Sequence, residues 1–129
     1  MTTARFAIFL LGSLALLGAA VGAEGRALPF DTVLIGTKGT KIEDPKEGVL
    51  TLGRVAVDAL LVMSESERTL SGTDKFKRGE LAHKIFNEPK APLKIEEIAL
   101  IKERIGLVYG PEVVTPAWKL IEGTTSDGK

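Results

Sequence analysis

The chain has no cysteine and few aromatic side chains, and its 129 residues include one Trp, one Tyr and one His. Without Cys it forms no disulfide, offers no thiolate for zinc or redox chemistry, and carries no cysteine to which a lipid would be attached. The fold must therefore be held together by the packing of apolar side chains alone.

The chain also lacks a charge surplus of either sign, because 17 Lys and Arg balance 17 Asp and Glu. Nucleic-acid binding depends on clustered positive charge that neutralises phosphates. We therefore expect no nucleic-acid partner. Removal of residues 1–23 would take away one charge, Arg5, and leave 16 basic against 17 acidic side chains, a net charge of −1.

Apolar residues are concentrated near the N-terminus, where residues 6–23 carry no charge. Arg5 precedes this run, and the small residues Val21 and Ala23 close it, as in a secretory signal peptide. We predict export to the periplasm, with cleavage after Ala23. Because 18 residues reach only the lower limit for crossing a bilayer, an uncleaved inner-membrane anchor is the alternative. A misassigned start of the chain is a third interpretation.

The remainder is predicted to form one compact α-rich domain over residues 24–122. About 100 residues suffice for a single domain whose core needs no metal or disulfide. The fold class that we expect is mainly α (α+β), with a short N-terminal β-hairpin followed by about four packed helices. Residues 123–129, Gly-Thr-Thr-Ser-Asp-Gly-Lys, are predicted to be a disordered tail.

Two segments rich in β-forming residues predict the hairpin, residues 30–35 and 40–42. Gly36 and Gly39 supply the turn between them, and Pro45 and Gly48 follow the second segment. The turn sequence resembles a phosphate-binding loop only superficially, because two glycines around four residues and a following Lys-Ser or Lys-Thr pair are missing. We interpret it as a hairpin turn.

The spacing of apolar residues predicts four helices, over residues 52–63, 72–87, 95–109 and 111–122. Thr51 is a suitable N-cap for the first helix. This helix is expected to be buried on most of its circumference, with Met63 on its apolar face. Ser71, with Asp74 three residues later, predicts the start of the second helix. Residues 64–67 between the two are a polar connector.

The second helix runs through the apolar residues Phe76, Leu81, Ala82, Ile85 and Phe86. The third and fourth helices each have an apolar face, formed by Ile98, Ile101, Ile105 and Val108 in the third and by Val113, Val114, Ala117, Leu120 and Ile121 in the fourth. Arg104 is expected to point away from the apolar stripe of the third helix. Gly110 is expected to end that helix in the left-handed conformation. Pro116 is expected to kink or break the fourth.

The sequence contains no recognisable catalytic constellation. His83 has no carboxylate or hydroxyl partner at a recognisable spacing, which favours a surface or half-buried role over that of a catalytic base. Glu96 and Glu97 are neighbours in a helix and do not face each other, so they fit a role in the first helical turn. We therefore predict a non-enzymatic protein with no catalytic residue, no cofactor and no metal site.

The candidate partner-binding residues are Lys77, Arg78, Lys84 and Trp118. Together with Lys75, the three basic residues make the second helix the most basic part of the chain. Such a surface suits an acidic protein partner, and an ordinary solvated helix face is the alternative. Trp118 suits either a contact with a partner or an anchor in the core.

Three segments resemble a group of small proteins of tailed phages and prophages. They are Thr-Leu-Gly-Arg-Val-Ala-Val-Asp-Ala-Leu-Leu at 51–61, Leu-Ser-Gly-Thr-Asp-Lys-Phe-Lys-Arg at 70–78, and Glu-Glu-Ile-Ala-Leu-Ile-Lys-Glu-Arg-Ile-Gly at 96–106 with Tyr109–Pro111, Val113–Val114 and Ala117–Trp118. The resemblance covers about residues 30–122. Its motifs concern packing and capping, so it implies a fold rather than a chemistry. Residues 1–26 and the pair Thr115-Pro116 depart from the group.

The resemblance and the leader together suggest an interaction protein of phage or prophage origin. The first hypothesis is an exported or inner-membrane-tethered accessory protein that docks on a phage or host envelope protein. The second is an assembly factor in the host cytoplasm or virion, such as a tail or head chaperone. An enzyme that uses scattered carboxylates is the third. The sequence indicates neither the identity of the partner nor the oligomeric state.

Overall fold

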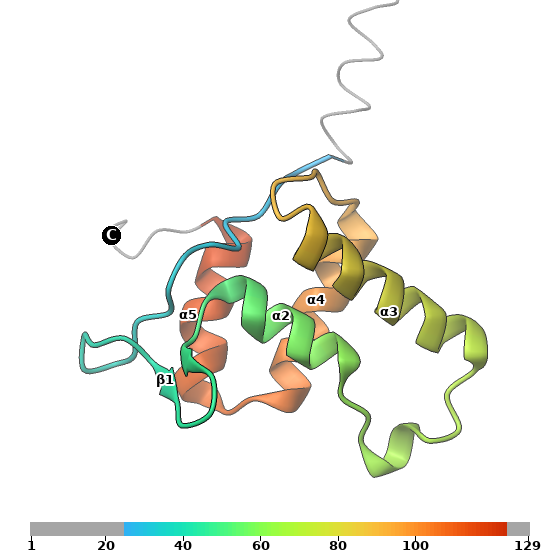
Figure 1. Cartoon of the computed structure of the whole chain (residues 1–129), viewed down its shortest axis with the longest axis horizontal. Helices are drawn as coiled ribbons and strands as arrows, with labels where there is room; N and C mark the ends of the chain where they lie inside the picture. The colour runs from blue at the N-terminus through green and yellow to red at the C-terminus, as the bar shows by residue number, and fades with distance from the viewer. Residues whose placement is uncertain (1–24, 124–129) are drawn as a thin grey trace, which may run out of the picture.

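The structure, a computed structural model, describes residues 25–123 (Figure 1). The predicted leader and the predicted tail beyond Gly123 lie outside the described residues. Within the described part, the fold is mainly α with a short antiparallel hairpin near its N-terminal end, as predicted. No helix between residues 25 and 123 has both the length and the apolar character needed to cross a membrane.

The β-structure is formed by residues other than those predicted. β1 (Glu43–Asp44) pairs antiparallel with β2 (Gly48–Val49). The two predicted strands are joined to each other only through an isolated bridge between Ile35 and Lys41. The turn between them does form, because the chain reverses there, but the regular ladder lies after it.

A ring of three backbone hydrogen bonds explains this difference. The N–H of Leu34 donates to the C=O of Leu50 (2.9 Å), Leu50 donates to Ile42 (2.9 Å), and Ile42 donates back to Leu34 (3.0 Å). Each of the three segments therefore pairs with both others over only a few residues, which leaves no room for a long ladder. Leu34 and Leu50 are buried, so the ring fastens the hairpin region to the core.

α2 (Leu52–Leu61) supplies the central part of the core and crosses in front of α4 in Figure 1. The predicted N-cap is confirmed, because the Thr51 hydroxyl accepts a hydrogen bond from the N–H of Arg54 at 3.2 Å. The buried residues of the helix are Leu52, Val55, Ala56, Ala59 and Leu60. The predicted burial of Met63 is wrong, since Val62 is already extended and Met63 is 41% exposed.

α3 (Gly72–Asn87) follows after a short 3₁₀ helix, η2 (Glu65–Glu67), within the predicted polar connector. Its predicted start is confirmed by the hydrogen bond from the N–H of Asp74 to the Ser71 hydroxyl (3.1 Å). Of the apolar residues in this helix, Phe76 and Phe86 are exposed, with exposed fractions of 66% and 77%. α3 packs mainly on α2, so only the narrow stripe of Leu81, Ala82 and Ile85 is covered.

α4 (Ile95–Val108) packs on α2 and α5. The predicted first-turn position of Glu96 and Glu97 is confirmed, and the carboxylate of Glu97 also accepts a hydrogen bond from the N–H of Lys94 (2.8 Å). The predicted apolar stripe is buried at Ile98, Ile101 and Ile105. Val108, at the end of the helix, is 37% exposed and therefore lies outside the core.

α5 (Pro111–Glu122) differs from the prediction at Gly110 and in having no break at Pro116. Gly110 is extended rather than left-handed and precedes Pro111 at the start of the helix, whereas Gly123 takes the left-handed conformation, with φ of 79°. The helix also continues through Pro116 without a break. Pro116 leaves unpaired only the carbonyl four residues earlier, that of the exposed Glu112, which water can reach.

Candidate functional site

The basic residues of α3 do not form one free surface. Lys77 is exposed, but Arg78 and Lys84 pair with acidic side chains of the same domain. Arg78 Nη2 lies 3.0 Å from Glu67 Oε2, and Lys84 Nζ lies 3.4 Å from Glu97 Oε1. The Arg78 side chain is only 12% exposed. Two of the three candidate cations thus stabilise contacts between elements of the fold.

Trp118 joins α5 to α4. Its Nε1 donates a hydrogen bond to the C=O of Lys102 (3.1 Å), and Lys102 Nζ lies 4.6 Å from the ring centroid. A Cβ at Gly106 would lie 2.9 Å from Cζ2 of the ring, so the glycine makes room for the indole. Trp118 is half-buried in this contact and is not brought together with the basic residues of α3.

Arg104, which was expected to point away from the apolar stripe of its helix, is buried together with that stripe at 2% exposed, and that expectation is wrong. Its Nε donates to the C=O of Ala59 (3.1 Å), and its Nη2 donates to the C=O of Val62 (3.0 Å) and to Glu67 Oε1 (3.2 Å). Its Nη1 pairs with Glu67 Oε2. The guanidinium thus caps the C-terminal end of α2, whose carbonyls have no helical partner, and fixes the connector.

Arg104, Glu67 and Arg78 together form what we call the Arg104 clamp. Hydrogen bonds from the N–H of Ser64, from Arg78 and from Arg104 hold the pKa of Glu67 well below its usual range, because each favours the charged carboxylate. Arg78 Nη1 is buried without a hydrogen-bond partner among the described residues. Through Glu67, the clamp joins η2 to Arg78 of α3 and to Arg104 of α4, and these contacts stabilise the fold.

A second group of polar residues lies beside the hairpin. Burial, and then the negative charge of Glu47, raise the pKa of Asp58. Burial, and then the charge of Asp58, raise the pKa of Tyr109 to about 12. Arg54 Nη1 lies 2.8 Å from Glu47 Oε1, and the positive charge of Arg54 offsets part of this negative charge. Between residues 25 and 123, no three His, Asp or Glu side chains come together as a metal site, and His83 is exposed.

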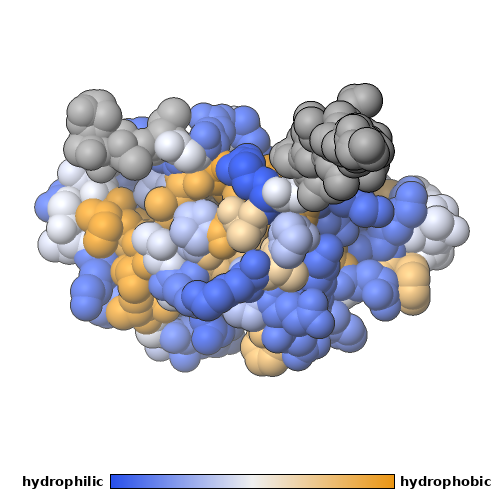
Figure 2. Space-filling model, turned by 90° about the horizontal axis from the view of Figure 1, so that it is seen from above, coloured by the Kyte–Doolittle hydropathy of each residue, from blue (hydrophilic) through white to orange (hydrophobic). Residues whose placement is uncertain are grey.

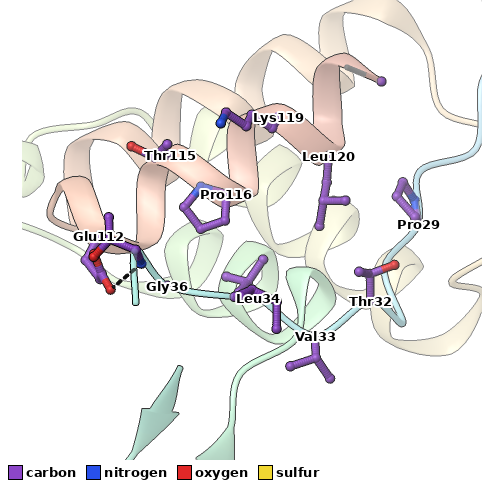
Figure 3. A pocket seen from close by; sticks show the side chains of 13 residues that line it. Pro29, Thr32, Val33, Leu34, Gly36, Glu112, Thr115, Pro116, Lys119 and Leu120 are labelled. Carbon is purple, nitrogen blue, oxygen red and sulfur yellow. Dashed lines mark hydrogen bonds between the residues drawn. The ribbon is translucent and has the colours of Figure 1, made fainter. Parts of the chain in front are cut away.

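A groove of about 680 Å³ lies between residues 32–37 and α5 (Figure 3). Its lining residues are Pro29, Thr32, Val33, Leu34, Ile35, Gly36, Thr37, Glu112, Thr115, Pro116, Lys119, Leu120 and Gly123. Leu34, Pro116 and Leu120 point toward one another from its opposite walls (Figure 3). Figure 2 shows a broad apolar area on the side of the molecule where α5 and the N-terminal segment lie in Figure 1.

Glu112 closes one end of the groove. Its two carboxylate oxygens accept hydrogen bonds from the N–H and the hydroxyl of Thr37, both at 3.0 Å. A Cβ at Gly36 would meet the Glu112 carboxylate, so the hydrogen bonds in their present geometry favour a glycine there. This contact joins the two walls of the groove across 75 positions in the sequence.

None of the groove residues was among the partner-binding residues predicted from the sequence. The one signal in the sequence was the pair Thr115-Pro116, which departs from the phage group and lies in the α5 wall. The apolar residues on the other wall, such as Leu34, are indistinguishable in the sequence from ordinary core residues.

No protein-family model, curated protein or solved structure matches the chain. The resemblance to phage proteins therefore stays a prediction. A second, smaller hollow of about 340 Å³ is lined by apolar residues such as Phe30 and Phe86 and by Asp31, Arg54 and Asp58. The groove is about twice as large and its walls are mostly apolar, so it is the candidate functional site.

Proposed function

We propose that the chain is a non-enzymatic docking module that binds a protein partner in the groove between residues 32–37 and α5. The groove itself carries the proposal, since ligand sites are typically concave, mostly apolar and about 300–1,000 Å³ in volume. Apolar surface that a domain leaves uncovered also marks interaction sites. A volume of about 680 Å³ fits this class.

Three of the four partner-binding residues predicted from the sequence have contacts within the domain instead. Arg78, Lys84 and Trp118 each make contacts within the domain, so their use by a partner would disturb the fold. Lys77 is exposed and stays a candidate contact. A partner that binds in the groove would leave these contacts within the domain in place.

In this proposal residues 1–23 export the chain or tether it to the inner membrane, and the partner is a phage or host envelope protein. This part rests on the apolar leader and on the resemblance to phage proteins. It predicts that protein produced in a bacterium appears in the periplasm with Glu24 at its N-terminus, or in the membrane with Met1 intact. Mass spectrometry of the fractions tests it, and an intact Met1 in the soluble cytoplasmic fraction would instead favour the assembly factor.

Site-specific photo-crosslinking tests the docking surface. A benzophenone amino acid is placed at Thr115, an exposed residue of the groove wall, at Lys77, or at Thr73 as an exposed control on α3. We expect a discrete crosslinked partner from position 115 and none from position 73. A partner captured from position 77 alone would move the docking surface to the basic face of α3.

A further inference from the structure

Residues 32–37 line the groove without interruption. Successive side chains of an extended segment point to opposite faces, so side chains alone would contribute every second residue. Six consecutive lining residues therefore mean that the edge of the backbone itself borders the groove. Which backbone groups are still available on this edge determines what the groove can bind.

The even-numbered residues of the segment use their backbone groups within the domain. The C=O of Thr32 accepts a hydrogen bond from the N–H of Leu52. The N–H of Leu34 donates to Leu50, and its C=O accepts from Ile42. The N–H of Gly36 donates to the C=O of Thr40. In an extended chain the groups of alternate residues point to opposite sides. Val33 and Ile35 therefore direct their N–H and C=O groups to the other edge.

This other edge is unpaired. Among the described residues, no hydrogen bond reaches the N–H or C=O of Val33 or Ile35. Val33 is half-buried, Ile35 is 46% exposed and both line the groove, so a chain that lies in the groove would be within reach of these four groups. Thr37, next on the same edge, already donates its N–H to Glu112 and ends the available stretch. An open edge of this kind is a template for a further strand.

We propose that the partner contributes an extended, uncharged peptide segment that adds as a strand to the edge at Val33 and Ile35. This rests on the docking function proposed above and specifies the chemistry of the partner. The backbone of the segment pairs with the four open groups, and alternate apolar side chains enter the groove beneath α5.

The charges of the groove favour an uncharged segment. Glu112 and Lys119 are the two charged residues of its lining. Both oxygens of Glu112 already accept hydrogen bonds from Thr37, and Lys119 is also engaged. A charged side chain that entered the groove would lose hydration without gaining an opposite charge.

The size of the groove favours a short segment. A volume of about 680 Å³ matches a drug-sized ligand or a few residues of peptide. Residues 124–129 start beside the groove at Gly123, but they carry Asp127 and Lys129, and these charges do not suit the apolar walls.

Hydrogen exchange measured by NMR on the full-length chain tests the proposal. The probe is the capped, uncharged hexapeptide Thr-Val-Thr-Val-Thr-Val. Without it, we expect the amides of Val33 and Ile35 to exchange rapidly, whereas Leu34 is protected by its bond to Leu50. At saturating peptide, exchange at positions 33 and 35 should slow by about tenfold or more, because a bonded amide must open before it exchanges.

Two N-methylated probes separate strand pairing from simple apolar binding. One carries N-methyl groups on all three valines and the other on all three threonines, and only one set can face the edge. We expect one of them to bind about tenfold more weakly than the parent peptide and the other to bind like it. Equal affinity of all three peptides would overturn strand addition.

Substitutions in the groove wall distinguish a failure of strand addition from a failure of the proposed docking function. Thr115→Lys places a charge on the groove wall, and Thr73→Lys is its exposed control on α3. If Thr115→Lys alone weakens peptide binding while N-methylation changes nothing, the docking site stands and strand addition is wrong. If no peptide binds at millimolar concentration, strand addition is also wrong, and crosslinking at position 115 still decides the docking function.

Protection of Val33 and Ile35 without any peptide would overturn the proposal as well. In a monomer, protection that disappears when residues 1–23 are removed would show that the chain's own apolar leader occupies the edge. Protection that rises with protein concentration, together with a dimeric mass, would show that a second copy occupies it.

Discussion

Arg104 and the groove differ in how completely they use their polar groups. Nε, Nη1 and Nη2 of Arg104 all have partners, although the residue is only 2% exposed, whereas Arg78 Nη1 in the same clamp has none among the described residues. In the groove, Val33 and Ile35 leave four backbone groups open while Leu34 between them is fully paired and buried. The open edge is thus a local feature of a segment whose neighbouring residues are firmly held.

The largest expected effect is the loss of the clamp. Arg104→Ala removes a buried cation and leaves the carbonyls of Ala59 and Val62 without their partner. We expect a loss of about 3–5 kcal/mol in the free energy of unfolding, measured by urea denaturation. Arg54→Ala, which breaks an exposed pair with Glu47, should cost about 1 kcal/mol or less. Similar losses in the two variants would show that the clamp is no stronger than a surface ion pair.

The contact between α4 and α5 should give the next largest effect. Gly106→Ala adds a Cβ 2.9 Å from the Trp118 ring, so we expect a net loss of about 1–2 kcal/mol despite the higher helix propensity of Ala. The matched control is Gly79→Ala in α3, where a Cβ meets no atom within 4 Å. This change should stabilise the chain by up to about 1 kcal/mol. A stabilising Gly106→Ala would show that the indole moves aside easily.

The pH dependence of stability tests the electrostatics of the clamp. Because the pKa of Glu67 is lowered in the folded chain, the folded state binds its proton less readily than the unfolded state. The contribution of Glu67 to stability is therefore complete above its ordinary pKa of 4.5 and is lost as the pH falls below that value. The lowered pKa of Asp44 likewise makes the chain less stable as the pH falls. The raised pKa of Asp58 has the opposite effect on stability.

We expect the unfolding midpoint of the natural chain to fall more steeply below about pH 4.5 than that of Glu67→Gln, which has no carboxylate to protonate. Thermal unfolding followed by circular dichroism at a series of pH values measures both slopes. Parallel curves for the two proteins would mean that Glu67 is not tightly held by Ser64, Arg78 and Arg104.

The smallest effect is expected on the basic face of α3. Replacement of Lys77 and Lys84 together by Ala should change the free energy of unfolding by no more than about 1 kcal/mol. Lys77 is exposed, and Lys84 loses only a partly exposed pair with Glu97. Urea denaturation measures the change, and Lys77→Ala alone should have no measurable effect. If this double variant lost partner binding while Thr115→Lys kept it, the basic face rather than the groove would be the docking surface.

The local features of the fold could be predicted from the sequence, because they depend on neighbouring residues. Thr51 and Ser71 both cap the helices that follow them, since a hydroxyl at that position satisfies an amide three residues later. Helical spacing also gave the buried stripe of α4 correctly from Ile98 to Ile105. The spacing does not show which apolar residues of α3 are covered, and Phe76 and Phe86 stay exposed because α3 packs mainly on α2.

The candidate site could not be predicted, because it depends on contacts between distant residues. Glu67 and Arg104 are 37 positions apart, so the sequence alone gave no reason to place an arginine in the core. The groove requires Glu112 to reach Thr37 across 75 positions. The open edge at Val33 and Ile35 follows from the ring of Leu34, Ile42 and Leu50, which no local pattern indicates.

The ring of hydrogen bonds also separates the parts of the hairpin region that can vary in length from those that cannot. Two loops leave the ring, one through Gly39 and one through Gly48, and both glycines have a positive φ, of 81° and 82°, that other residues rarely adopt. Lys38 and Lys46 in these loops are exposed, so the loops are suited to accept residues inserted beside the glycines, since lengthening an exposed loop adds little closure entropy. An epitope or a second domain inserted after Lys38 or Lys46 would leave the ring and the edge beside it in place.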